Sequence, residues 1–158
     1  MNSLVTLPHG EQVTLDNGVP YTISGLVVLK SQHASGMPLR TQPLPVGRKF
    51  TGLHVLLGYA WDGQPGAVFC TFKINYQGGK SVSVGALCEV NAQGWWEAPK
   101  LLKGAALAWE GRNEAHSPIC LYDMPWKKPR PDRMVESIEI ISGNSDAIPI
   151  IAGMTRTR

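Results

Sequence analysis

The chain contains one long alternation of apolar and polar residues, Val68-Phe69-Cys70-Thr71-Phe72-Lys73-Ile74-Asn75-Tyr76, followed by Gln77-Gly78-Gly79-Lys80 and then by Ser81-Val82-Ser83-Val84. One face is apolar and consists of Val68, Cys70, Phe72, Ile74 and Tyr76, whereas Thr71, Lys73 and Asn75 point to the other face. A period of two is typical of a half-buried β-strand. Because two glycines separate the two runs, we predict an antiparallel hairpin.

Similar but shorter strand patterns recur along the whole chain, and no segment keeps a helical period over three turns. We predict further strands at about Glu11–Leu15, Tyr21–Leu29, Lys49–Leu57, Ala105–Trp109, Pro118–Tyr122, Met134–Ile141 and Ile148–Met154. About nine short strands separated by Gly- and Asn-rich turns indicate an all-β fold, a two-sheet antiparallel β-sandwich of the jelly-roll type.

The composition is that of one globular domain. The chain has 158 residues, of which 43% are hydrophobic and 17% charged, so we treat residues 1–158 as a single β-sandwich module. A net charge of +3 gives no support for nucleic-acid binding, and no apolar run is long enough to span a membrane. The three cysteines are far apart in sequence, and we expect all three to be reduced and buried.

The usual catalytic motifs are missing from the sequence. There is no nucleophile elbow, no glycine-rich nucleotide loop and no histidine spacing typical of a transition-metal site, so we expect no enzymatic activity. His54 lies within a strand pattern, where a hydrogen-bonded structural role is the simplest interpretation. We expect no cofactor and leave open a structural calcium ion held through Asp16 and Asp62.

Two adjacent tryptophans, Trp95 and Trp96, stand in a segment bounded by Gly94 and Pro99 that has almost no strand pattern. Large rings in such a loop suggest apolar surface offered to a sugar or to a partner protein. Since neighbouring residues of an extended chain point in opposite directions, we expect at least one of the two indoles to be exposed. Glu97, Arg112 and Asn113 are the polar neighbours that we expect beside them.

The other tryptophans have different surroundings in the sequence. We expect Trp61 to close the core, whereas Trp109, at a strand end, fits a core position and a ligand platform equally well. Trp126 opens a segment that contains Lys127, Lys128, Arg130 and Arg133, and burial under that segment is its simplest interpretation. We expect these basic residues to be solvated, with an anion-binding edge as the alternative.

Several segments together resemble a known group of modules. They are Gly47–His54, Trp95-Trp96, Ala108-Trp109-Glu110-Gly111, Leu121–Asp132, Ile138–Ser142 and Ala147–Ala152. The chain resembles the non-catalytic, galactose-binding-like jelly-roll modules of large multidomain bacterial proteins, many of which degrade polysaccharides. Lys128 replaces an asparagine usual in that group, and the acidic residues usual before the double tryptophan are absent.

The resemblance implies a non-catalytic carbohydrate-binding module that targets an attached catalytic domain to a polysaccharide or oligosaccharide. The candidate ligand-binding residues are Trp95, Trp96, Glu97, Trp109, Arg112, Asn113 and Trp126. Such a role would place the protein outside the cell or in the periplasm. The alternative is a structural or protein-interaction domain that packs on a catalytic partner and buries its tryptophans at the interface.

Overall fold

The computed structural model describes residues 4–158, which form eleven strands and no helix. The strands are β1 (Gly10–Thr14), β2 (Pro20–Ile23), β3 (Val27–Val28), β4 (Leu44–Arg48), β5 (Gly52–Ala60), β6 (Val68–Tyr76), β7 (Ser81–Leu87), β8 (Ala106–Gly111), β9 (Ile119–Lys127), β10 (Val135–Ser142) and β11 (Ile148–Thr157). They form a four-stranded sheet in the order β4-β10-β6-β7 and a five-stranded sheet in the order β3-β11-β5-β9-β8. The predicted all-β sandwich is confirmed.

The hairpin predicted from the alternation is β6–β7. Asn75 pairs with Ser81 across the turn, and Gly78 and Gly79 have φ values of 97° and 93°, which L side chains rarely adopt. The alternation holds from Cys70 onward, but Val68 is 42% exposed. A bulge between Val68 and Cys70 shifts the register, so the predicted burial of Val68 is wrong.

The strands depart from the prediction in two places. The predicted run Tyr21–Leu29 divides into β2, which pairs with β1, and β3, which pairs with β11. β4 was not predicted because its sequence contains Pro45 and Gly47, both unfavourable in strands. Since β4 forms the edge of the four-stranded sheet and pairs only with β10, it tolerates a proline that a central strand would exclude.

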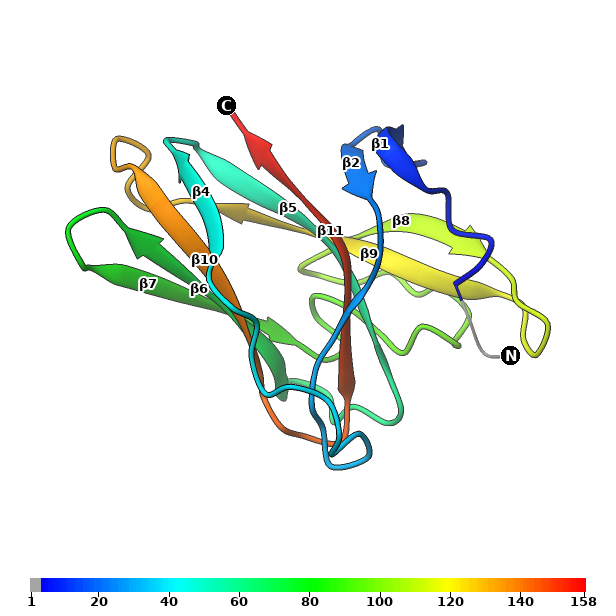
Figure 1. Ribbon diagram of the computed structural model, residues 1–158. Helices are drawn as coiled ribbons and strands as arrows, with labels where there is room; N and C mark the ends of the chain where they lie inside the picture. The colour runs from blue at the N-terminus through cyan, green and yellow to red at the C-terminus, as the bar shows by residue number, and fades with distance from the viewer. Residues whose placement is uncertain (1–3) are drawn as a thin grey trace.

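The main core lies between the two larger sheets. Alternate residues of β5, such as Val55 and Leu57, pack with Phe72 and Ile74 of β6 and with Ile140 of β10. Figure 1 shows the four-stranded sheet on one side of β5 and β11 and the β1–β2 hairpin on the other side. The five-stranded sheet is therefore covered on both faces.

A second core lies on the outer face of the five-stranded sheet. Leu56 of β5 and Leu121 of β9 pack there with Tyr21 of β2, Trp95 and Trp109. Because β5 is buried on both faces, its sequence is apolar almost without interruption, as is usual for strands with two covered faces. This second core anchors the loop that carries the paired tryptophans.

Candidate functional site

The paired tryptophans lie where β5 and β9 separate. The pairing of these strands ends at Leu57 and Tyr122, and beyond that point a segment containing Trp95 enters the gap. The Trp95 amide donates a hydrogen bond to the Tyr59 carbonyl at 2.9 Å, and the Cys120 amide donates to the Trp95 carbonyl at 2.9 Å. The main chain of Trp95 thus bridges the two strands and holds its loop rigidly against the sheet.

The new pairing is parallel, with Tyr59 opposite Gly94. The bridge brings the segment Tyr59-Ala60-Trp61-Asp62 to the same pocket as Gly94-Trp95-Trp96-Glu97. These eight residues line an open pocket of about 540 Å³. Each segment contributes an indole followed by a carboxylate.

Trp61 is the most exposed tryptophan, with 61% of its surface accessible. Its φ is +67°, in the left-handed region that bulky residues rarely adopt, and this conformation turns the chain out of the line of β5. The prediction that Trp61 closes the core is therefore wrong. A positive φ is rare for a tryptophan, so the sequence pattern gave no signal for it.

A histidine supports the exposed indole. The ring of His33 stacks on Trp61 with a centroid separation of 4.4 Å and an interplanar angle of 27°. His33 Nε2 lies 3.3 Å from Asp146 Oδ1, which fixes the orientation of the imidazole. One face of Trp61 is thus packed within the protein.

The paired indoles have different surroundings. Trp95 is only 8% exposed and belongs to the second core, whereas Trp96 is half-buried and lines the pocket. Trp96 stacks on His116 with a centroid separation of 5.3 Å and an interplanar angle of 6°. We expected at least one of the two indoles to be exposed. Trp96 meets this expectation only in part, because it is half-buried, and Trp95 does not meet it.

A polar network fixes the loop that carries Glu97. Lys100 Nζ lies 2.7 Å from Glu97 Oε2 and 3.1 Å from Glu89 Oε2, and the Tyr59 hydroxyl donates to Glu89 at 2.9 Å. Hydrogen bonding to Glu97 and then to Glu89 raises the pKa of Lys100, while burial raises the pKa of Tyr59. Both groups therefore remain protonated donors, and the loop is ordered without a ligand.

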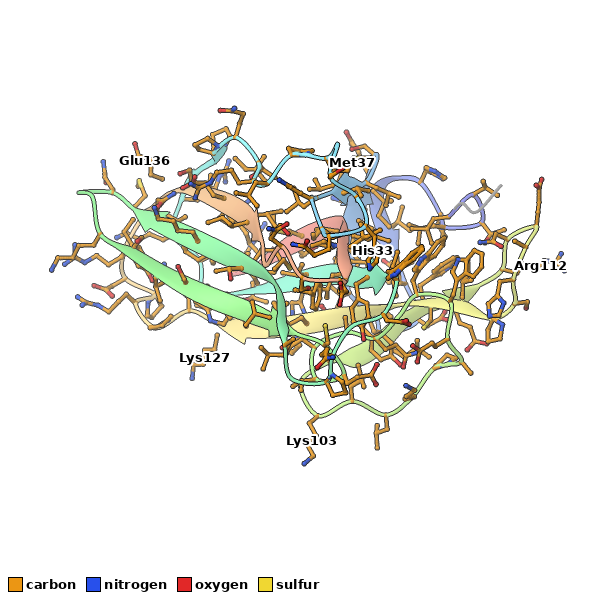
Figure 2. All side chains as sticks on the ribbon, turned by 90° about the horizontal axis from the view of Figure 1, so that it is seen from below. His33, Met37, Lys103, Arg112, Lys127 and Glu136 are labelled. Atoms are coloured by element: carbon orange, nitrogen blue, oxygen red, sulfur yellow. The ribbon has the colours of Figure 1, made fainter. Side chains whose placement is uncertain are left out.

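The polar candidates Arg112 and Asn113 lie in the turn that follows β8, not in the pocket lining. Asn113 Oδ1 accepts hydrogen bonds from the amides of Ala115 and His116, at 2.9 and 2.8 Å. Asn113 thereby positions His116, which supports Trp96. Figure 2 shows Arg112 at one end of the molecule, where its side chain is exposed.

The candidates Trp109 and Trp126 also lie outside the pocket lining. Trp109 is 6% exposed and packs in the second core, so of its two interpretations the structure favours the core position. Trp126 is half-buried and packs against the main core. The structure therefore brings together Trp95, Trp96 and Glu97 from the predicted set and adds Trp61 and Asp62.

The predicted structural role of His54 is confirmed. His54 Nδ1 lies 2.8 Å from Asp123 Oδ2, and the hydroxyl of Tyr21 donates to Asp123 Oδ1 at 2.8 Å. Burial raises the pKa of Tyr21, so its hydroxyl keeps its proton and satisfies the nearly buried carboxylate. These contacts fasten β2 to the outer face of the five-stranded sheet.

The basic segment after Trp126 differs from the expectation at one residue. Lys127, Arg130 and Arg133 are exposed, but Lys128 is only 1% exposed. Its Nζ donates to the carbonyl of Arg133 at 2.6 Å and lies over the rings of Phe50 (4.9 Å) and Tyr76 (5.5 Å). Burial lowers the pKa of this amine. The buried ammonium group of Lys128 therefore holds the loop between Lys128 and Arg133 against the rings of Phe50 and Tyr76.

The cysteine prediction is confirmed, since Cys70, Cys88 and Cys120 are free and buried. Within residues 4–158, His, Cys, Asp and Glu side chains form no group of three or more that could hold a metal ion. The same part of the chain has no helix long and apolar enough to cross a membrane. Comparison with protein-family models, curated proteins and solved structures finds no match.

Proposed function

We propose that this domain is a non-catalytic carbohydrate-binding module whose ligand lies in the pocket between Trp61 and Trp96. The observation that carries the proposal is Trp61, a large indole held 61% exposed at a φ of +67° and supported from behind by His33. Backbone strain persists where the surrounding structure imposes it and is concentrated at ligand sites. The flat C–H face of a pyranose ring is a suitable partner for such a surface.

The second wall of the pocket supports the same function. Trp96 is fixed by His116 and by the backbone bridge through Trp95, so it needs little ordering when a ligand arrives. Asp62 and Glu97 provide carboxylate oxygens that accept hydrogen bonds from sugar hydroxyls. The pocket thus combines stacking surfaces with acceptors at its edge.

The affinity expected from this site is low. One stacked ring contributes about 1 kcal/mol, so two platforms with a few exposed hydrogen bonds give dissociation constants of about 0.1 to 1 mM. Weak binding is adequate for a module tethered to an enzyme, because attachment raises the local concentration of the catalyst on a polymer. An attached catalytic domain and a polysaccharide ligand therefore belong to the proposal.

The test is a glycan array followed by titration of soluble oligosaccharides, monitored by NMR. Trp61→Ala should weaken binding at least about fivefold, which corresponds to the loss of about 1 kcal/mol of stacking. Leu101→Ala is the matched control, because Leu101 is fully exposed and lies outside the pocket lining. Undiminished binding by Trp61→Ala and by Trp96→Ala would exclude this pocket. A blank array together with a stable partner complex would indicate a protein interface instead.

A further inference from the structure

Resting on the proposed function, we propose that the pocket selects sugars that carry a protonated amine, that is, amino sugars with a free amino group, over neutral and acidic sugars. The starting observation is the charge of the lining. Asp62 and Glu97 are its only ionisable carboxylates, and no lysine, arginine or histidine lines the pocket within residues 4–158. A ligand in this pocket therefore meets negative charge.

The aromatic walls add to this preference. The face of an indole carries negative electrostatic potential, and tryptophan is the strongest cation–π partner among the side chains. Trp61 and Trp96 each have one face covered, by His33 and His116 respectively, and both line the pocket. An ammonium group on a stacked sugar would lie close to these rings and to the carboxylates at the same time.

Asp62 and Glu97 do not contribute equally to the preference for a protonated amine. Glu97 is already paired with Lys100 at 2.7 Å, so part of its charge is neutralised. Asp62 is exposed and forms no ion pair with any side chain of residues 4–158. We therefore assign the larger share of the selectivity to Asp62.

The expected magnitude is modest because the contact is open to solvent. A single exposed charge pair should improve binding about threefold to fivefold, and the improvement should shrink as ionic strength rises. A uronic acid at the same place would bring a carboxylate next to Asp62 and Glu97 and should bind more weakly than the neutral sugar.

The experiment compares β-1,4-linked tetramers of glucosamine, N-acetylglucosamine and glucose at a pH below the pKa of the sugar amine. The glucosamine tetramer should bind about threefold to fivefold more tightly than the other two. Asp62→Asn should remove most of that difference, because it should weaken binding of the glucosamine tetramer more than binding of the neutral tetramers. Lys100→Gln should increase the difference, because it frees the charge of Glu97.

The matched control for non-specific attraction is Glu136→Gln. Glu136 is exposed, Figure 2 shows it at the opposite end of the molecule from Arg112, and it does not line the pocket. This variant therefore changes the net charge by the same amount as Asp62→Asn without altering the pocket. Glu136→Gln should leave the preference for the glucosamine tetramer unchanged.

Equal binding of all three tetramers would overturn the inference and leave the proposed function standing. Failure of all three to bind would overturn both, and tighter binding of a trimethyllysine peptide would overturn the assignment to a sugar.

Discussion

The backbone conformation of Trp61 leads to a prediction about which small residue this position prefers. At most exposed positions alanine is more stable than glycine, because glycine loses more conformational freedom on folding. Trp61 has a φ of +67°, where only glycine is free of strain. We expect Trp61→Gly to be more stable than Trp61→Ala, the reverse of the usual order.

The magnitude follows from two opposing contributions. A left-handed conformation costs an L-residue about 1 to 2 kcal/mol, and the entropic penalty of glycine relative to alanine is about 0.5 to 1 kcal/mol. The midpoints of the two ranges favour Trp61→Gly by about 0.8 kcal/mol, and their limits give about 0 to 1.5 kcal/mol. Both variants lose the stacking contact with His33, so that loss cancels in the comparison.

The assay is urea unfolding of the two variants, with Asp62→Ala and Asp62→Gly as the control pair. Asp62 is also exposed and is the next residue in the chain, but it is not among the residues with positive φ. Asp62→Ala should therefore be more stable than Asp62→Gly by about 0.5 to 1 kcal/mol. If Trp61→Ala proved more stable than Trp61→Gly by the same margin as in the Asp62 pair, position 61 would carry no backbone strain. Glycan titration of Trp61→Gly then measures how much affinity is lost with the indole ring, in the more stable of the two variants.

Three further predictions concern groups outside the pocket. Burial raises the pKa of the Cys88 thiol to about 11. An unfolded thiol titrates near about 8.5, so between these values the unfolded chain releases its proton first. The Cys88 thiol should therefore lower the free energy of unfolding by about 1.4 kcal/mol per pH unit as the pH rises, in addition to the falls from Cys70 and Cys120, whose pKa values burial also raises. Urea unfolding across this range should show a fall for Cys88→Ala that is shallower by that amount. Lys128→Met should cost about 1 to 3 kcal/mol in the same assay at neutral pH, because it removes the donor to the part-buried Arg133 carbonyl and the ammonium group over the rings of Phe50 and Tyr76. An unchanged midpoint would contradict this role. Gly143→Ala should cost about 1 to 3 kcal/mol, since its Cβ would lie 2.1 Å from the Val68 carbonyl oxygen; Gly25→Ala, which meets open space, is the control and should change stability by less than about 0.5 kcal/mol.

Local patterns were sufficient to predict most of the sheet. The alternation that ends at Tyr76 and the two glycines after it specify the β6–β7 hairpin, because strand period and turn conformation depend on neighbouring residues. The edge strand β4 was not predictable in this way. Its pairing with β10 is a long-range contact, and only the absence of a partner on its other side makes Pro45 acceptable.

The candidate site was predicted only in part for a similar reason. The Gly- and Pro-bounded segment around Trp95 and Trp96 was visible in the sequence, but the second wall comes from a residue in another loop. Trp61 enters the pocket through the parallel bridge between Tyr59 and Gly94 and through its own positive φ. Neither feature has a local sequence signature. Lys128 shows the same limit, since its burial depends on rings and carbonyls supplied by other parts of the chain.

The arrangement of the pocket also connects stability with function. A fold selected only for stability would favour glycine at position 61, because glycine accepts the left-handed conformation and removes a large exposed apolar ring. The chain instead keeps a tryptophan there, supports it with His33 and sets it beside Trp96 on a backbone that is already ordered. Strain, exposure and pre-organisation at one residue are together what we expect of a surface that gains its stabilisation from a ligand.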